Sequence, residues 1–150
     1  MPLDPDLTGR DFPATPAYGV SRRHIAAFAA AVGESAPVHH DVEAARAAGH
    51  ADVVAPVTFP IVIAFGAMQA LLDDPEVGID LRHVIHADQR FESVRPVRAG
   101  DSLTARLTVE SQRSMGGSDI IATRTELTGP EGELVCTAYA RLAHTAPDPT

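Results

Sequence analysis

The sequence predicts an α+β fold in which an antiparallel β-sheet curls around one long buried helix. Three observations support this prediction. Residues 58–72, TFPIVIAFGAMQALL, contain only two polar side chains, Thr58 and Gln69, so a helix there has no polar face. Strand-like segments joined by short turns follow from residue 81 onward. The chain has 150 residues, of which 45% are apolar, and this suits one domain with a substantial core.

The apolar segment 58–72 is predicted to be a core helix and not a membrane span. A helix that is apolar all round must be enclosed on all sides by protein or lipid. Its 15 residues fall short of the roughly 20 that cross a bilayer. Thr58 is expected to cap the helix through its side-chain oxygen, and Pro60 is tolerated in the first turn. Asp73 and Asp74 mark the end of the helix. We therefore expect the sheet to wrap it completely.

The second half of the chain is predicted to form four antiparallel strands. Their residues alternate between apolar and polar and are rich in Val, Ile, Thr and Leu. The segments span about residues 81–94, 101–113, 118–128 and 133–144. In the second of them, Leu103, Ala105, Leu107 and Val109 share one face. Short glycine-containing turns favour antiparallel neighbours. An antiparallel sheet curled around a single helix is the hotdog arrangement.

Smaller elements precede the apolar helix. Residues 1–17 are rich in Pro and polar side chains and are expected to form an extended arm, followed by a short strand at 18–20. Ser21 is a favourable N-cap for a helix, and Gly33 stands where a C′ glycine belongs.

A second short helix is expected between Asp41, as its N-cap, and Gly49, where it stops. The end of the chain, 145–150, is expected to be a flexible tail. The whole chain, 1–150, is expected to be a single domain.

Composition and charge exclude several classes of function. The formal net charge is −8 and there is no cluster of Lys and Arg, whereas nucleic-acid binding requires a basic surface. The single cysteine, Cys136, cannot form an internal disulfide and is expected to be a small core residue. The first residues lack the basic and apolar regions of a signal peptide. We therefore expect a cytoplasmic protein that binds neither nucleic acid nor membrane.

The most informative stretch runs from Gly33 to Asp41, GESAPVHHD. It resembles the MaoC-like family of (R)-specific enoyl hydratases and 3-hydroxyacyl dehydratases, whose motif reads Gly-Asp-x-Asn-Pro-(Ile/Leu/Val)-His with an acid two residues further on. The residues that match in register are Gly33, Pro37, Val38, His39 and Asp41. Glu34 stands at the position of the catalytic Asp, and Ala36 replaces the Asn.

A second stretch, residues 49–59 (GHADVVAPVTF), narrows the resemblance. The MaoC-like family has Ala-His-Gly at the head of the hotdog helix, where this chain has Ala55-Pro56-Val57. This stretch, together with Gly9-Arg10, is similar to the HadA-type subgroup, which resembles the dehydratase part of type I fatty acid synthase. The resemblance implies a heterodimer in which one hotdog subunit carries the Asp/His pair and the other shapes the acyl-chain tunnel.

The resemblance implies a site for adding water to a trans-2-enoyl thioester, or for removing it. The catalytic candidates are Glu34 and His39, since a carboxylate and an imidazole can hold one water and move its proton. The developing enolate oxygen needs a backbone donor at the helix N-terminus, where Val57 and Thr58 lie. Pro56 has no N–H and alters that part of the site. We expect no cofactor and no metal, because adjacent histidines rarely converge on one ion.

Several hypotheses of function remain open. One is a homodimeric (R)-specific 3-hydroxyacyl-thioester dehydratase/enoyl hydratase that acts on acyl-ACP or acyl-CoA through Glu34 and His39. Another is the tunnel-forming partner of a separate catalytic MaoC-like subunit. A non-catalytic acyl-thioester-binding protein is the alternative that Ala36 and Pro56 favour. A hotdog thioesterase is disfavoured, because the apolar helix carries no acid before Asp73. The exposed edge of a lone hotdog sheet predicts a dimer in each case.

Overall fold

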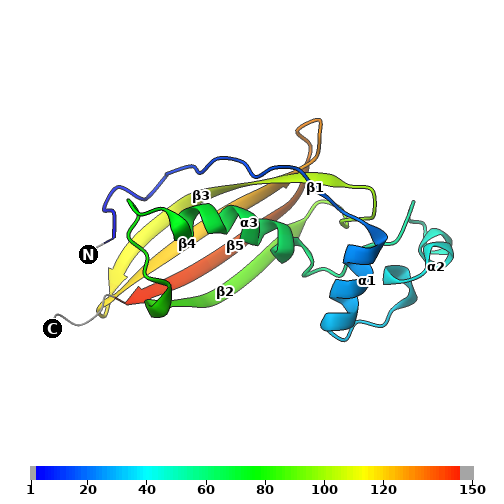
Figure 1. Cartoon of the computed structure of the whole chain (residues 1–150), viewed down its shortest axis with the longest axis horizontal. Coiled ribbons are helices and arrows are strands. Elements are labelled where there is room, and N and C mark those ends of the chain that lie inside the picture. The colour runs from blue at the N-terminus through cyan, green and yellow to red at the C-terminus, as the bar shows by residue number, and fades with distance from the viewer. Residues whose placement is uncertain (1–2, 146–150) are drawn as a thin grey trace.

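The computed structural model describes residues 3–145, and it has one curled sheet around one long helix (Figure 1). The strands are β1 (Tyr18–Gly19), β2 (Val84–Ser93), β3 (Ser102–Met115), β4 (Ser118–Thr128) and β5 (Leu134–Thr145). The α-helices are α1 (Arg22–Ala31), α2 (Val42–Ala47) and α3 (Pro60–Asp73), and short 3-10 helices span Pro37–His39 and Leu81–His83. This arrangement agrees with the predicted fold class.

The sheet has the strand order β1-β3-β4-β5-β2, and all neighbours are antiparallel. The predicted inward face of β3 is confirmed, because Leu103, Ala105, Leu107 and Val109 are fully buried. The pairing shifts register between Val109 and Ser111, where β3 bends. Within residues 3–145, β2 pairs only with β5, so its other edge is open.

The N-terminal arm covers the opposite edge of the sheet. The Phe12 N–H donates to the Leu107 carbonyl, and the Thr15 N–H donates to the Ala105 carbonyl, each at 2.9 Å. Three apolar side chains anchor the arm in the core, namely Leu3, Leu7 and Phe12. At the other end of the chain, Thr145 is the last residue of β5, and the rest of the expected tail lies outside the described residues.

Helix α3 packs against the concave face of the sheet through one side only. Its buried residues are Pro60, Ile63, Ala64, Ala67, Met68 and Leu71. On the opposite side, the exposed fractions of Val62 and Phe65 are 39% and 48%. The expectation of a helix enclosed on all sides is therefore wrong for this chain alone, because one sheet covers only one side of the cylinder.

The predicted N-cap of α3 is also wrong. The helix begins at Pro60, its N-cap is Phe59 in a helical conformation, and no side chain caps it. The Phe59 N–H donates to the Pro56 carbonyl at 2.9 Å, so residues 56–59 form a turn that leads directly into the helix. A capping side chain needs an extended N-cap residue, and this turn removes that geometry from Thr58. Phe59 is buried and packs edge-on against Phe28, which fixes the turn.

The two smaller helices have the predicted caps. The Ser21 hydroxyl accepts a hydrogen bond from the His24 N–H at 3.0 Å, and Gly33 follows α1 with a φ of 75°. The Asp41 carboxylate accepts the Glu43 N–H at 2.9 Å at the start of α2. Both helices lie beyond one end of the sheet, beside the N-terminus of α3 (Figure 1). The segments of the sequence motif therefore lie near the N-terminus of α3.

Candidate functional site

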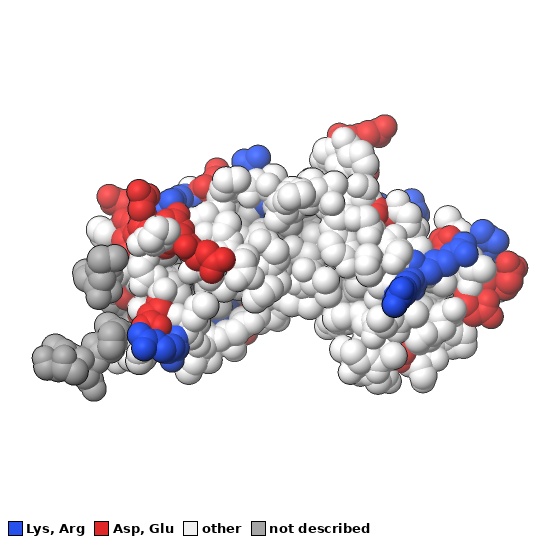
Figure 2. Space-filling model, viewed as in Figure 1, with Lys and Arg blue, Asp and Glu red and all other residues white. Residues whose placement is uncertain are grey.

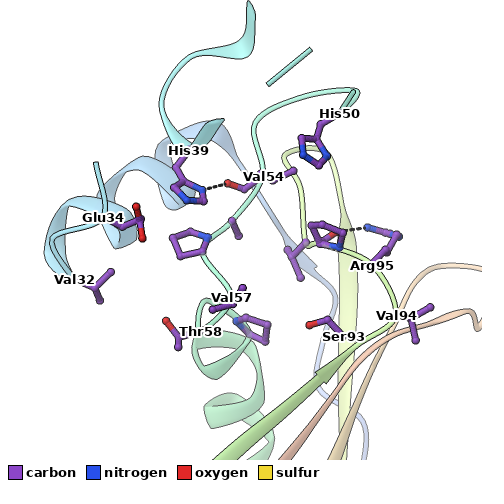
Figure 3. A pocket seen from close by; sticks show the side chains of 15 residues that line it. Val32, Glu34, His39, His50, Val54, Val57, Thr58, Ser93, Val94 and Arg95 are labelled. Atoms are coloured by element: carbon purple, nitrogen blue, oxygen red, sulfur yellow. Dashed lines mark hydrogen bonds between the residues drawn. The ribbon is translucent and has the colours of Figure 1, made fainter. Parts of the chain in front are cut away.

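A cavity of about 640 Å³ opens at the N-terminal end of α3 (Figure 3). It is lined by Val32, Glu34, His39, His50, Val54, Ala55, Pro56, Val57, Thr58, Pro60, Ser93, Val94, Arg95, Pro96 and Val97. These residues come from the end of α1, the segment that leads into α3, and the end of β2. All five site residues singled out in the sequence are among them, so the fold brings the two sequence motifs to one place.

His39 is held by a hydrogen bond to the backbone. Its Nδ1 lies 2.6 Å from the Val54 carbonyl oxygen. A carbonyl can only accept, so in the neutral ring Nδ1 carries the proton and Nε2 keeps its lone pair. The ring is half-buried at the end of the 3-10 helix Pro37–His39. This arrangement leaves one ring nitrogen available as a base.

Glu34 belongs to the loop that follows α1, and His40 directly follows the 3-10 helix Pro37–His39. The Glu34 carboxylate accepts the Ala36 N–H at 3.3 Å, and the Glu34 side chain is exposed to solvent. His40 contacts the same loop, since its Nε2 lies 3.0 Å from the Glu34 carbonyl oxygen. Figure 3 shows the Glu34 carboxylate and the His39 ring on the same side of the cavity. Of the two adjacent histidines, His39 therefore lines the cavity and His40 supports the loop.

Two residues of the turn that leads into α3 line the cavity and have unpaired backbone N–H groups. Among the hydrogen bonds of residues 3–145, none is donated by the Val57 or the Thr58 N–H. Pro56 has no N–H, and its carbonyl accepts from Phe59. Free N–H groups at a helix N-terminus carry partial positive charge and attract an anionic oxygen. The Val57 and Thr58 amides are therefore suited to stabilise negative charge.

Ser93, the last residue of β2, and Val94, which follows it, line the cavity but belong to neither sequence motif. The Ser93 hydroxyl donates to the Cys136 sulfur at 3.7 Å. Burial raises the pKa of the Cys136 thiol, while the hydrogen bond from Ser93 opposes this effect. Cys136 is thus a buried, neutral thiol in the core, as predicted. Only the long-range pairing of β2 with β5 brings this part of the chain to the cavity, and no local pattern signals it.

Arg95 is tied to the turn that forms one wall of the cavity. Its two terminal nitrogens donate to the two carboxylate oxygens of Asp101 at 2.8 and 2.9 Å. The Asp101 carboxylate raises the pKa of Arg95, and partial burial opposes this effect. The Arg98 N–H also donates to Asp101, at 2.9 Å. The Arg95 guanidinium is therefore paired with Asp101 and does not face the cavity as a free cation.

Residues 3–145 contain neither a cluster of metal ligands nor a membrane-spanning helix. Nowhere in this range do three or more His, Cys, Asp or Glu side chains gather as metal ligands would. No helix in the same range combines the length and apolar character needed to span a bilayer.

The fold and the cavity define a hotdog protein of the hydratase/dehydratase type. Residues 6–138 match the family model described as the FAS1-like dehydratase domain region. The chain belongs to this family, and the predicted hotdog fold and the resemblance to MaoC-like dehydratases are confirmed.

Similar proteins match nearly the whole length of this chain. A UPF0336 protein of Streptomyces griseus is 49% identical over 142 residues, which cover 95% of each chain. A chain of the HadBC (3R-hydroxyacyl-ACP dehydratase) complex of Mycobacterium tuberculosis is 35% identical with a TM-score of 0.83, covering 94% of this chain and 99% of that one. A MaoC-like dehydratase is 29% identical with a TM-score of 0.88, and the match covers 95% of this chain but 43% of that one.

Proposed function

We propose that this chain is a subunit of an (R)-specific 3-hydroxyacyl-thioester dehydratase/enoyl hydratase acting on acyl-ACP or acyl-CoA. The observation that carries the proposal is the placement of His39 and Glu34 on one side of a cavity whose other side is the N-terminus of α3. A base, a carboxylate and backbone donors for an oxyanion are the groups this reaction needs. The similar HadBC complex is described as a (3R)-hydroxyacyl-ACP dehydratase, which agrees with this proposal.

The proposed chemistry needs one water and no cofactor. In the hydration direction, His39 Nε2 accepts a proton from a water that Glu34 helps to orient, and the hydroxyl adds to C3 of the enoyl thioester. The electron pair of the double bond moves toward the thioester carbonyl, whose oxygen takes up negative charge near the Val57 N–H. The protonated His39 ring then delivers this proton to C2. The water supplies both the hydroxyl and the hydrogen, so the reaction balances, and dehydration is its reverse.

A second candidate role is the tunnel-forming partner of a separate catalytic hotdog subunit. Pro56 lines the cavity and supplies neither an N–H nor an imidazole at this point. Glu34 is one methylene longer than the Asp of the family motif, and a displacement of about 1 Å can lower a rate by about a hundredfold. Because HadBC is a complex of two subunits, a second hotdog chain is a reasonable partner.

Hydration of crotonyl-CoA by the purified chain tests the catalytic role. We expect His39→Ala to lower kcat by about a hundredfold or more, because it removes the general base. His40→Gln is the matched control, since it replaces the adjacent imidazole, which does not line the cavity, and retains a side-chain N–H for the Glu34 carbonyl; it should retain activity. Equal rates for His39→Ala and the wild type would remove His39 from the mechanism.

The same assay with a second MaoC-like subunit separates the two roles. Activity that appears only in the mixture and is unaffected by His39→Ala would support the tunnel-forming role. Cleavage of the thioester without hydration would contradict both roles.

A further inference from the structure

The orientation of His39 depends on the backbone at Val54. The acceptor of its Nδ1 proton is the Val54 carbonyl, at 2.6 Å. The Val54 N–H in turn donates to the Val38 carbonyl at 3.1 Å, so residues 38 and 39 are joined to Val54 by two hydrogen bonds. A carbonyl acceptor fixes the ring only if its own peptide is fixed. Whatever holds the segment that contains Val54 therefore controls the tautomer and direction of the imidazole.

One side of this segment is held by the sheet end. The Ala55 N–H donates to the Val97 carbonyl at 2.7 Å, and the Ala99 N–H donates to the Val53 carbonyl at 3.0 Å. Neither of these bonds involves the Val53 N–H, which needs an acceptor elsewhere. The Asp52 carboxylate accepts it at 2.7 Å.

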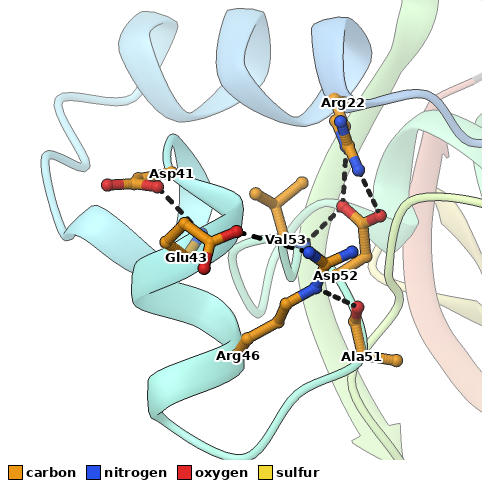
Figure 4. A network of polar contacts seen from close by, with 7 residues as sticks. All are labelled: Arg22, Asp41, Glu43, Arg46, Ala51, Asp52 and Val53. Carbon is orange, nitrogen blue, oxygen red and sulfur yellow. Dashed lines mark hydrogen bonds and ion pairs between the residues drawn. The ribbon is translucent and has the colours of Figure 1, made fainter.

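The other side of the segment is held by α1 through an ion pair (Figure 4). Arg22, the first residue of α1, donates from Nε and Nη2 to the two carboxylate oxygens of Asp52 at 2.9 and 2.8 Å. This two-pronged geometry fixes the direction of the carboxylate as well as its distance. The same carboxylate accepts the Val53 N–H, so the Asp52–Val53 peptide, one residue before Val54, is connected to α1.

We infer that Arg22 and Asp52 are positioning residues that hold the Val54 carbonyl against the His39 ring. Neither residue lines the cavity, so neither contacts a group held inside it. The pair acts through two steps, from Asp52 to the backbone of residues 53–54 and from Val54 to the imidazole. Its importance for catalysis rests on the proposed function of His39, whereas its effect on the ring does not.

The ion pair is suited to a constant positioning role. The hydrogen bonds from Arg22, and next the Val53 N–H, lower the pKa of Asp52 to about 2. The carboxylate therefore stays charged throughout the neutral range, and the pair holds across that range. An exposed ion pair adds little to the free energy of folding. Its loss should therefore disturb the ring more than it disturbs the fold.

The experiment compares Asp52→Asn and Arg22→Gln with Arg23→Gln. The control removes the same charge from the neighbouring exposed position. Heteronuclear NMR of the imidazole nitrogens reports the tautomer of His39. We expect the wild type and Arg23→Gln to have the proton on Nδ1, and the two test variants to have a mixture of both tautomers. In the hydration assay, with its partner subunit if one is required, kcat should fall about tenfold with KM unchanged, less than the hundredfold of a 1 Å displacement.

Further outcomes separate this inference from the proposed function. An unchanged His39 tautomer in Asp52→Asn and Arg22→Gln would overturn the inference, whatever the activity. A mixed tautomer in chains that never hydrate a substrate would support the positioning role and contradict the proposed function. If Asp52→Asn fails to fold, Arg22→Lys is decisive, since lysine retains the charge but lacks the planar fork. It should then show the mixed tautomer, and a single tautomer would overturn the inference.

Discussion

Neighbouring residues of the same type have different roles in this protein. His39 and His40 are adjacent in the sequence, but their rings bind different carbonyl groups, those of Val54 and Glu34. The first carbonyl belongs to the wall of the cavity and the second to the loop after α1. A resemblance in sequence identified His39, while only the structure explains why its ring is fixed. At the residue scale, the role of each histidine depends on the carbonyl group that its ring contacts as much as on the imidazole itself.

The Asp52 carboxylate gives the folded state a specific dependence on pH. Its pKa in the fold is about 2, below the ordinary value of 3.8, chiefly because Arg22 donates to it. A carboxyl group whose pKa is lower in the folded state than in the unfolded state stabilises the fold at pH values above its unfolded pKa. This stabilisation is lost as the pH falls toward 2. We therefore expect the difference in Tm between the wild type and Asp52→Asn to be full above about pH 4 and to shrink toward pH 2.

Thermal unfolding followed by circular dichroism measures this difference. In an Arg22→Gln background the effect of Asp52→Asn on Tm should be smaller above about pH 4, because the main cause of the pKa shift is gone. A Tm difference that stays constant between about pH 4 and pH 2 would mean that Asp52 has an ordinary pKa in the folded state.

At the element scale, local chemistry predicted most of the fold. The caps of α1 and α2 and the inward face of β3 were readable because each depends on residues close in sequence. The start of α3 was not readable in this way. Phe59 adopts a helical conformation because its ring is buried against Phe28, from a different helix. A tertiary contact therefore overrode the local capping preference of Thr58.

The Ser21 cap of α1 contributes to the stability of the helix that carries Arg22. Ser21→Ala removes the acceptor of the His24 N–H and should lower the free energy of unfolding by about 1 kcal/mol. The corresponding loss in Tm is about 3 °C for a chain of this length. Urea denaturation checks the first value and calorimetry the second.

The control for this prediction is Ser21→Asp, which retains an oxygen acceptor at the N-cap and should keep most of the stability. If Ser21→Ala and Ser21→Asp lose the same amount, the hydroxyl contributes through some contact other than the cap.

At the scale of the whole molecule, the site could be predicted only in part. Both sequence motifs converge on the cavity as expected, but the end of β2 completes it with Ser93 and Val94. These residues are far from both motifs in the sequence and join them through the closure of the sheet. Sheet pairing of this kind follows from the packing of the entire chain, which a local pattern does not encode.

The surface around the cavity and α3 is unusually apolar for an exposed region. Val32, Val57 and Val94 are exposed at the cavity, and Val62 and Phe65 are exposed on α3. Figure 2 shows this view of the molecule with its charged side chains gathered mainly toward the two ends. Exposed apolar patches of this kind mark interaction surfaces. Together with the open edge of β2, they support the proposal of a second hotdog subunit.

Val94→Glu tests whether a subunit covers this surface. Val94 has an exposed fraction of 68%, so a charge there is tolerated in the single chain but becomes costly when a partner removes water from it. We expect the substitution to raise the dissociation constant at least about tenfold, which corresponds to about 1.4 kcal/mol. Sedimentation of the chain alone, and of the chain mixed with a MaoC-like subunit, measures this constant for a homodimer and a heterodimer.

Met115→Glu provides the matched control. Met115 is 69% exposed, almost the same as Val94, but it lies at the end of β3 and does not line the cavity. A charge there should leave association unchanged, because no partner is expected at that end of the sheet. If both substitutions weaken assembly equally, the effect belongs to added charge in general. If neither does, the partner binds elsewhere and the cavity mouth stays open to solvent in the assembled protein.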